Sequence, residues 1–364
     1  MFDLDNLLDT NFSSQVPSGD TSEGHTAGDS EPVSGLPFSE PGYEGSIDYR
    51  IRQLSYSSLL TLHSCPRKYQ LYKLGASREA NSTRQRITFA FGHVVGEAVQ
   101  LALEGKSEAE VIWAMFCRWE VDIFTFDERA NKSLWSAILA IKRFFDLRKQ
   151  GFLDEYELVE YNGKPAVELS FCIVFPDGFR YRGHVDAVLR HKLSGEILVL
   201  ECKTTGAESL NPAIYKNSAQ AVGYSIVLDA IFSGLSSYKV LYLVCQTKSL
   251  NWLPIYFTKS YLQRALWIRE LLLDIEMIRL YETAEVYPMH GESCVIFSTE
   301  TEKESKVWQG DCEYLQTCTL STEYLTKPMT AEKEDKTEYQ VTLTLMDLLN
   351  SQLENTAIAE EGTQ

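Results

Sequence analysis

Three residues of this chain have the types and the spacing needed to hold a divalent cation and activate a water molecule. Asp186 lies in the strand-like segment FRYRGHVDAVLR, and Glu201 and Lys203 end the apolar segment EILVLECK. If the intervening KLSG is a four-residue turn, Asp186 lies opposite Glu201, with the Cβ atoms roughly 4.5–5.5 Å apart. A three-residue turn at 176–178 would add Glu168 to the same row, and a register slip of one residue would disperse the row.

The charges of such a row indicate its chemistry. Neighbouring carboxylates repel one another unless a cation joins them, and Mg²⁺ combines one or two carboxylates with phosphate oxygens. A lysine beside them can orient an attacking water or stabilise developing negative charge. The alternative is that Asp186 and Glu201 are the solvated ends of surface strands. Glu201 interrupts a segment that is apolar on both faces, as in a central strand, but geometry alone leaves both interpretations open.

These segments resemble a known family. GHVDAVLR…GEILVLECKTTG is similar to the core of the PD-(D/E)xK nucleases, with Asp186, Glu201 and Lys203 on the D…ExK pattern. AQAVGY, in the next predicted helix, resembles the Q-x-x-x-Y motif of the RecB-like branch, carried by Gln220 and Tyr224. The resemblance implies that Asp186 and Glu201 hold Mg²⁺ or Mn²⁺ while Lys203 assists the water. It also implies that Gln220 and Tyr224 contact DNA.

The chain departs from this family in the helix before the strands. The family has G-x-x-x-H there, with the histidine on the metal, whereas FGHVVGEAVQ has Gly92 at the first position and Gly96 at the last. Either the metal has fewer protein ligands here, or the neighbouring Glu97 replaces the histidine as a metal ligand, or the enzyme is inactive.

Four of the eight cysteines lie where core packing does not explain them. Cys65 ends the first predicted helix in HSCPRKY, and Cys294, Cys312 and Cys318 follow the last long helix in a polar stretch. The set resembles the iron–sulfur staple of AddB-type and CRISPR-associated RecB-like exonucleases, including many phage proteins, with CEYLQTC as its ending. The resemblance implies a structural [4Fe–4S] cluster that joins the N-terminal helix to the C-terminal segment. Zn²⁺ and unliganded cysteines are the alternatives.

Taken together, these resemblances predict a metal-dependent DNA exonuclease, encoded by a phage or mobile element and active in replication, recombination or repair. Its substrate is expected to be a DNA end or a single strand. The rival interpretation is a catalytically silent nuclease fold that serves as a DNA-binding or assembly module, and the missing family histidine favours it.

The spacing of apolar residues changes along the chain from the period of helices to the period of strands, and these elements must position the site residues. The strands are expected at 167–175, 179–190, 196–203 and 238–247. One crossover helix over 211–234, with Asn211 as its cap and Pro212 in its first turn, precedes the last strand. A long helix over 260–282 follows. The fold class is therefore α/β, and the family resemblance implies a restriction-endonuclease-like mixed sheet flanked by helices.

The formal net charge of −17 is concentrated at the two ends of the chain. Residues 1–46 carry nine acidic and no basic side chains, and residues 319–364 carry a net −6, which leaves −2 for residues 47–318. The acidity therefore does not exclude nucleic acid as a ligand. We expect a disordered leader over 1–46, the nuclease domain over 47–318, and a mostly flexible tail over 319–364 with one short helix at 342–354.

Neither end of the sequence has the pattern of a membrane or export segment. The chain begins MFDLDNLLDT, without the basic and apolar regions of a secretory signal, and it contains no 18-residue apolar run. We expect a protein of the cytoplasm, of the host if a phage encodes it. The acidic ends are expected to be available to a protein partner.

Overall fold

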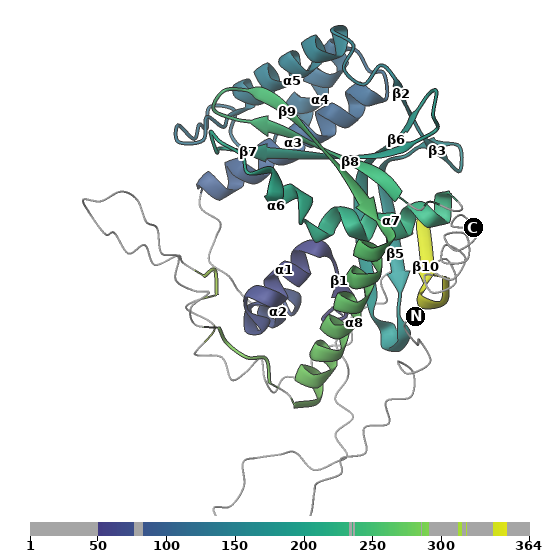
Figure 1. Ribbon diagram of the computed structural model, residues 1–364. Coiled ribbons are helices and arrows are strands. Elements are labelled where there is room, and N and C mark those ends of the chain that lie inside the picture. Colours follow the sequence, from purple (N-terminus) through teal and green to yellow (C-terminus); the bar gives the residue numbers. More distant parts are fainter. Residues whose placement is uncertain are drawn as a thin grey trace, which may run out of the picture. The chain divides into compact units, whose positions relative to one another are not determined.

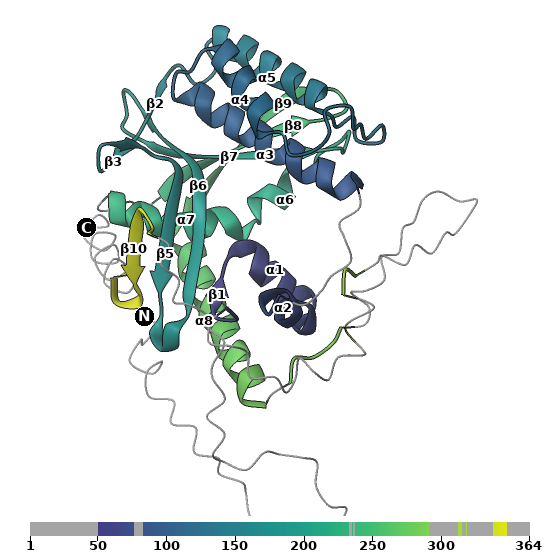
Figure 2. The same cartoon turned by 180° about the vertical axis from the view of Figure 1, so that it is seen from behind.

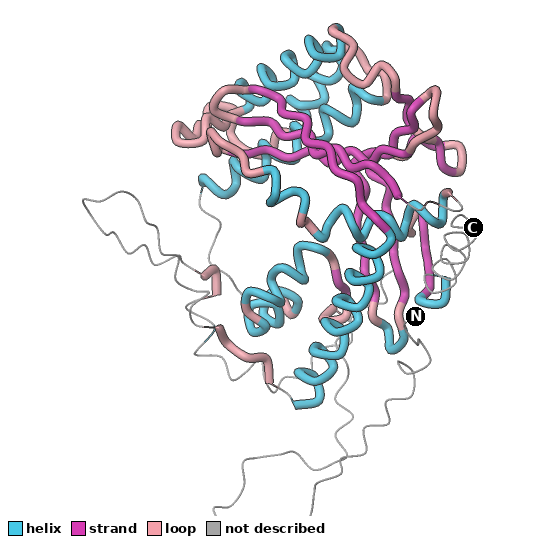
Figure 3. Tube along the Cα trace, in the orientation of Figure 1, coloured by secondary structure: helices cyan, strands magenta, loops and turns pink. Residues whose placement is uncertain are grey.

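The computed structural model describes residues 50–75, 83–232, 235, 237–284, 286–290, 312–314, 318 and 338–347. These residues belong to one compact unit, whose centre is a mixed β-sheet with helices packed against both faces (Figures 1 and 3). The predicted leader over 1–46 lies outside the described residues, as does most of the predicted tail.

The sheet follows the strand order β10-β5-β6-β7-β8-β9, and β1 and β2 pair with β6 outside that path. The strands are β1 (Gln53–Leu54), β2 (Tyr156–Leu158), β5 (Val167–Val174), β6 (Arg180–His191), β7 (Ile197–Thr205), β8 (Ser237–Gln246), β9 (Asn251–Ser260) and β10 (Val341–Thr344). A separate hairpin joins β3 (Glu160–Tyr161) to β4 (Lys164–Pro165). Strands β5, β6 and β7 are antiparallel neighbours, whereas β8 runs parallel to β7.

The two turns that set the register form as predicted. Phe175 N–H donates to the Phe179 carbonyl at 2.8 Å across the turn at 176–178, and His191 N–H donates to the Glu196 carbonyl at 2.9 Å. The left-handed backbone of Gly195, with φ of 72°, closes the second turn, a conformation that glycine adopts without steric cost. The registers of β5 on β6 and of β6 on β7 are consequently those that the turn lengths predict.

Helices cover both faces of the sheet (Figure 1). They are α1 (Tyr56–Ser64), α2 (Pro66–Lys73), α3 (Thr83–Leu103), α4 (Glu108–Arg118), α5 (Leu134–Lys149), α6 (Pro212–Lys216), α7 (Ala219–Ile231) and α8 (Tyr261–Ala284). Strand β7 is buried on both sides: Val199 belongs to the core with α7 and α8, while Leu198 and Leu200 belong to the core with α3 and α5. The position of β7 between β6 and β8 confirms that EILVLECK is a central strand. Within the described part of the chain, no helix is long and apolar enough to cross a membrane.

The prediction of one continuous crossover helix over 211–234 is wrong, because the segment forms two helices, α6 and α7. Asn211 caps the first as predicted, its side chain accepting a hydrogen bond from Ala213 N–H at 3.0 Å. The first helix ends at Asn217, and Ser218 then caps α7 by accepting a hydrogen bond from Gln220 N–H at 3.4 Å. Serine favours this role because its hydroxyl satisfies a free amide of the first turn.

The C-terminal segment differs from its prediction as well. Residues 342–344, expected to open a helix over 342–354, instead belong to β10, which pairs in parallel with β5 at the sheet edge, as Figure 2 shows from behind. The sequence VTLT alternates with a period of two, and Val341 is buried, which is typical of a strand with one face on the core. Strand β9, also absent from the prediction, forms the opposite edge.

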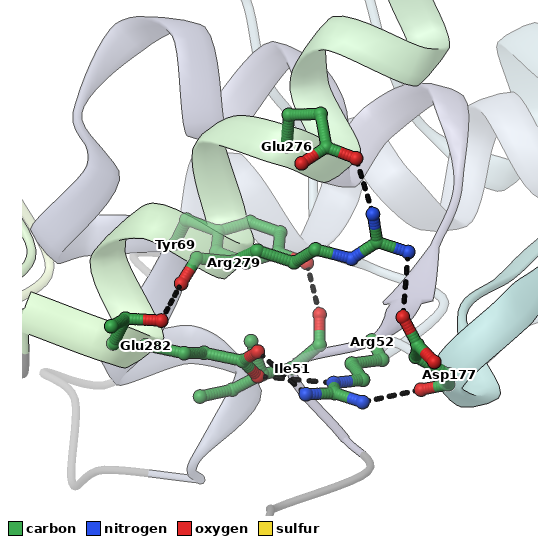
Figure 4. Close-up of polar contacts among 8 residues, drawn as sticks. Ile51, Arg52, Tyr69, Asp177, Glu276, Arg279 and Glu282 are labelled. Carbon is green, nitrogen blue, oxygen red and sulfur yellow. Dashed lines mark hydrogen bonds and ion pairs between the residues drawn. The ribbon is translucent and has the colours of Figure 1, made fainter. Parts of the chain in front are cut away.

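A polar network holds β1, α8 and the β5–β6 turn together (Figure 4). Arg52, which precedes β1, forms a two-pronged pair with Glu282 of α8 and also donates to the Asp177 carbonyl. Arg279 of α8 pairs with the Asp177 carboxylate at 2.8 Å. Both guanidinium groups lie over the buried ring of Phe179, at 5.0 and 5.5 Å from its centroid. These contacts fix the far end of the hairpin that carries Asp186.

Candidate active site

Asp186 lies at a break in the regular alternation of β6. Tyr181 and Val185 belong to the core beneath α7 and α8, whereas Ala187 belongs to the opposite core. Val185 and Ala187 therefore lie on opposite faces of the sheet, although strict alternation along a strand would place them on the same face. The break in alternation is caused by the neighbouring strand β5. There, Glu168 lies between Val167, which pairs with Ala187, and Leu169, which pairs with Val185. The backbone of Glu168 is left-handed, with φ of 48°.

The interruption also ends the pairing of β6 with β7. Within the described chain, that ladder runs only from Arg190 to Ala187, so Asp186 does not pair directly opposite Glu201 as predicted. Instead, the Asp186 carboxylate accepts a hydrogen bond from Cys202 N–H at 2.8 Å. This bond holds the Asp186 carboxylate at the backbone of Cys202, which lies between the predicted site residues Glu201 and Lys203.

Glu201, Lys203, Gln220 and Tyr224 form a closed ring of four hydrogen bonds. Lys203 Nζ lies 2.5 Å from Glu201 Oε1 and 2.9 Å from Gln220 Oε1. Gln220 Nε2 donates to the Tyr224 hydroxyl at 2.7 Å, and that hydroxyl donates to Glu201 Oε2 at 2.9 Å. Glu201 is 2% exposed and Tyr224 is 4% exposed, while Lys203 reaches solvent. The structure thus brings together the residues of two separate motifs around one buried carboxylate.

The electrostatics of this group are those of an anion-rich site with one cation. Burial raises the pKa of Asp186 well above its usual value, the charges of Glu201 and Glu168 raise it further, and the bond from Cys202 only partly offsets them. Burial opposes the charge of Lys203, but Glu201 and Asp186 outweigh that effect and raise the pKa of the ammonium group. Lys203 is therefore a fixed positive charge, and Asp186 is a carboxyl group whose ionisation the fold opposes.

Comparison with known proteins assigns this arrangement to a family. The model of the PD-(D/E)XK nuclease superfamily matches residues 53–344, which include every residue of the ring. The chain belongs to the PD-(D/E)XK nuclease superfamily. A comparison with curated proteins finds no match.

Two solved structures are similar at low identity. A proposed exonuclease from Eubacterium rectale is 12% identical, with 71% of this chain and 92% of that one covered and a TM-score of 0.40. The crystal structure of SSO0001 is 16% identical, with 61% and 88% covered and a TM-score of 0.25. At these identities and scores, neither structure bears on the function of this chain.

PD-(D/E)XK nucleases typically use a divalent metal ion. Asp186 and Glu201 fit such an ion, because their oxygen donors are of the kind that hard cations prefer and their repulsion is what a cation would relieve. Within the described residues, no three histidine, cysteine, aspartate or glutamate side chains are grouped so as to hold a metal ion. Asp186 and Glu201 are therefore the two carboxylates of this group that could hold such an ion.

Gly96, which occupies the position of the expected family histidine, borders open space. A Cβ atom built on Gly96 would have no neighbour within 4 Å, whereas one on Gly92 would meet Thr204 of β7 at 3.6 Å. Glu97, predicted as a substitute ligand, instead pairs with Arg118 of α4 at 3.1 Å. Helix α3 therefore passes close to β7 at Gly92, with open space beside Gly96.

Gln100 is a neighbour of the site that sequence reasoning missed. It is buried, and its Nε2 donates to Glu168 Oε1 at 2.7 Å, which holds the carboxylate whose charge raises the pKa of Asp186. The signal was present in the sequence, since Gln100 lies four residues after Gly96 and hence on the same side of the helix. A polar residue on an otherwise apolar helix face indicates a polar partner beneath it.

Three of the four predicted cluster cysteines lie near the segment that follows α8. His290 N–H donates to Cys65 Sγ at 3.5 Å, and the Cys318 thiol lies 3.4 Å from Met289 Sδ. Cys312 and Cys318 pack against the small core of Leu71 and Tyr314. Cys294 lies outside the described residues, and the described ones do not make up a metal site.

Proposed function

We propose that this chain is a metal-dependent deoxyribonuclease that hydrolyses phosphodiester bonds at DNA ends or in single strands. The observation that supports this most strongly is the convergence of Asp186, Glu201 and Lys203 at the break in β6, within a chain of the PD-(D/E)XK superfamily. Exonuclease action, and a role in replication, recombination or repair, belong to this proposal.

Each residue has a distinct role in the proposed reaction. Asp186 and Glu201 would hold Mg²⁺ or Mn²⁺, which when bound supplies Lewis acidity and lowers the pKa of water. Lys203 keeps its proton because of the two carboxylates and presents a positive charge, partly exposed, beside them. That charge orients the attacking water and stabilises the negative charge that develops on phosphorus-bound oxygens. Glu97 is the weakest member of the proposed metal set, because its carboxylate is paired with Arg118.

A second candidate is a silent nuclease fold that binds DNA or assembles with a partner. It is favoured by Gly96, which leaves the family's histidine position without a ligand. It is opposed by the placement of Lys203 beside Glu201, with Asp186 bonded to the intervening Cys202 amide, because this arrangement can hold a cation and orient a water.

A nuclease assay separates the two candidates. The full chain is incubated with 5′- and 3′-labelled single-stranded DNA, duplex DNA and single-stranded RNA, each with Mn²⁺, with Mg²⁺ and with a chelator. The proposal predicts metal-dependent loss of DNA and no loss in the chelator. DNA binding without cleavage in either metal would support the silent module and refute the enzyme.

We also propose that Cys65, Cys294, Cys312 and Cys318 hold a [4Fe–4S] cluster, with Zn²⁺ as the alternative. The support is that Cys65 and Cys318 contact adjacent residues, His290 and Met289, although they are far apart in sequence. Anaerobically purified protein should then be brown and contain about four irons per chain. Zinc without iron would assign the site to zinc, and the absence of both metals would refute it.

The remaining expectations are part of the same proposal. A chain with these motifs is proposed to be encoded by a phage or mobile element and to act in the cytoplasm. Its acidic ends are proposed to recruit a protein partner, which affinity capture with residues 1–46 present and deleted would test.

A further inference from the structure

Both oxygens of the Glu201 carboxylate accept a hydrogen bond in the ring. Oε1 accepts from Lys203 and Oε2 accepts from Tyr224, both within 3 Å. Each oxygen keeps a further lone pair that can bind a cation, but a cation on Oε1 would repel the Lys203 ammonium from that oxygen. Tyr224 is buried and rigidly placed, with its ring edge-on to Phe171 at 6.3 Å, whereas Lys203 is partly exposed and flexible.

Lys203 has a second anchor that does not depend on Glu201. Gln220 Oε1 accepts from the ammonium at 2.9 Å, and the amide nitrogen of the same side chain donates to Tyr224. This second bond orients the Gln220 amide, because the nitrogen donates to the hydroxyl and the oxygen is thereby turned toward the ammonium. Gln220 can thus retain Lys203 when Glu201 Oε1 is occupied by a cation.

We propose that Gln220 and Tyr224 are positioning residues for the metal carboxylate and the lysine, and that neither acts by contacting DNA. This inference rests on the proposed function, since the cation and the lysine have their roles there. Tyr224 keeps Glu201 in place through Oε2, which leaves Oε1 as the oxygen for the cation. Gln220 holds the ammonium at its working position after it leaves Glu201.

The burial of Tyr224 supports this assignment over a DNA contact. Only 4% of the residue is exposed, and its hydroxyl is engaged on both sides. A side chain that stacks on a base or donates to a phosphate must present a free face or a free donor. Tyr224 presents neither.

The test uses Tyr224→Phe, Gln220→Ala and the control Tyr238→Phe in the full chain. Tyr238 is a good control because it is also buried and its hydroxyl also bonds to α7, at the Ala221 carbonyl, away from the ring. Three quantities are measured: Mn²⁺ affinity by titration calorimetry, single-stranded DNA affinity by fluorescence anisotropy in a chelator, and kcat with KM for DNA cleavage in Mn²⁺.

The inference predicts a different pattern for each variant. Tyr224→Phe should weaken Mn²⁺ binding by about tenfold and lower kcat by a similar factor, with DNA affinity unchanged. Gln220→Ala should leave Mn²⁺ affinity within about twofold, lower kcat by about tenfold and leave KM unchanged. Tyr238→Phe should change none of the three.

Weaker DNA binding by Tyr224→Phe or Gln220→Ala, with unchanged Mn²⁺ affinity and an unchanged kcat, would overturn the inference and support a DNA contact. Failure of the wild type to bind Mn²⁺ would also overturn it. The proposed function fails separately, if the wild type binds Mn²⁺ and does not cleave DNA. In that case the affinity measurements still decide the roles of Tyr224 and Gln220. If Tyr224→Phe does not fold, the half-buried Gln220 still decides between the two roles.

Discussion

The pairing of Lys203 with Glu201 should be measurable as stability of the metal-free protein. Lys203→Met leaves a carboxylate that is 2% exposed without its cation, with only the Tyr224 bond remaining. Removing one partner of a fully buried pair costs about 3–5 kcal/mol, but the Lys203 side chain is 36% exposed and solvent screens it. We therefore expect a loss of about 2 kcal/mol in the free energy of unfolding.

A double-mutant cycle separates this interaction from other effects of the substitution. Glu201→Gln removes the buried charge, so adding it to Lys203→Met should recover most of the lost stability, with an interaction free energy of about 2 kcal/mol. Lys239 and Glu196 supply a matched control, because they form a comparable pair at 2.6 Å with both side chains more than a third exposed. That cycle should give about 0.5 kcal/mol.

The assay is urea unfolding of the full chain at pH 7 in a chelator, followed by circular dichroism. Saturating Mn²⁺ should then protect the wild type by roughly 2–4 kcal/mol, through preferential binding to the folded state. Additive effects of the two substitutions, within about 0.3 kcal/mol, would refute the reasoning that Lys203 neutralises a buried Glu201.

Three further predictions concern the surroundings of the site. Because the raised pKa of Asp186 means that the folded state holds its proton more tightly, this group stabilises the metal-free protein at low pH, and that stability is lost as pH rises through the folded pKa. Mn²⁺ affinity should therefore fall as pH falls through that pKa, and Glu168→Gln should move the fall to lower pH, as calorimetry at a series of pH values would show. Gly183→Ala would place a Cβ 2.9 Å from the Phe171 ring and should lower the free energy of unfolding in urea by about 1–3 kcal/mol. Deleting residues 338–364 removes β10 and exposes the edge of β5, so it should lower the thermal midpoint and promote association in light scattering, whereas a deletion from residue 348 should do neither.

The registers of β5 on β6 and of β6 on β7 could be predicted because turn length controls register. Two turns of readable length, at 176–178 and before Glu196, set the pairing of three strands, and both formed as predicted. The apolar stretch before Glu201 predicted a central strand because both of its faces lack polar side chains. In the structure, both faces are buried in the two cores.

The rest depended on interactions that a sequence pattern does not contain. Strict alternation failed at Asp186 because Glu168, on the neighbouring strand, has a left-handed backbone, and nothing local to β6 signals this. The break before α7 depended on the cap at Ser218, one of several polar residues that could have served. Strand β10 pairs with a partner about 170 residues away, a non-local contact that a local period cannot indicate.

The central claim is that DNA cleavage takes place at the site that contains Lys203. The most direct test measures the rate of single-stranded DNA cleavage in saturating Mn²⁺ for the wild type, Lys203→Met and Lys239→Met. Lys203 pairs with Glu201, one of the two carboxylates proposed to hold the metal, whereas Lys239 pairs with Glu196 elsewhere on the sheet. The account predicts that Lys203→Met binds DNA and Mn²⁺ but cleaves at least about 100-fold more slowly, while Lys239→Met cleaves at the wild-type rate. Equal cleavage by the wild type and Lys203→Met would show that the reaction does not occur at this site.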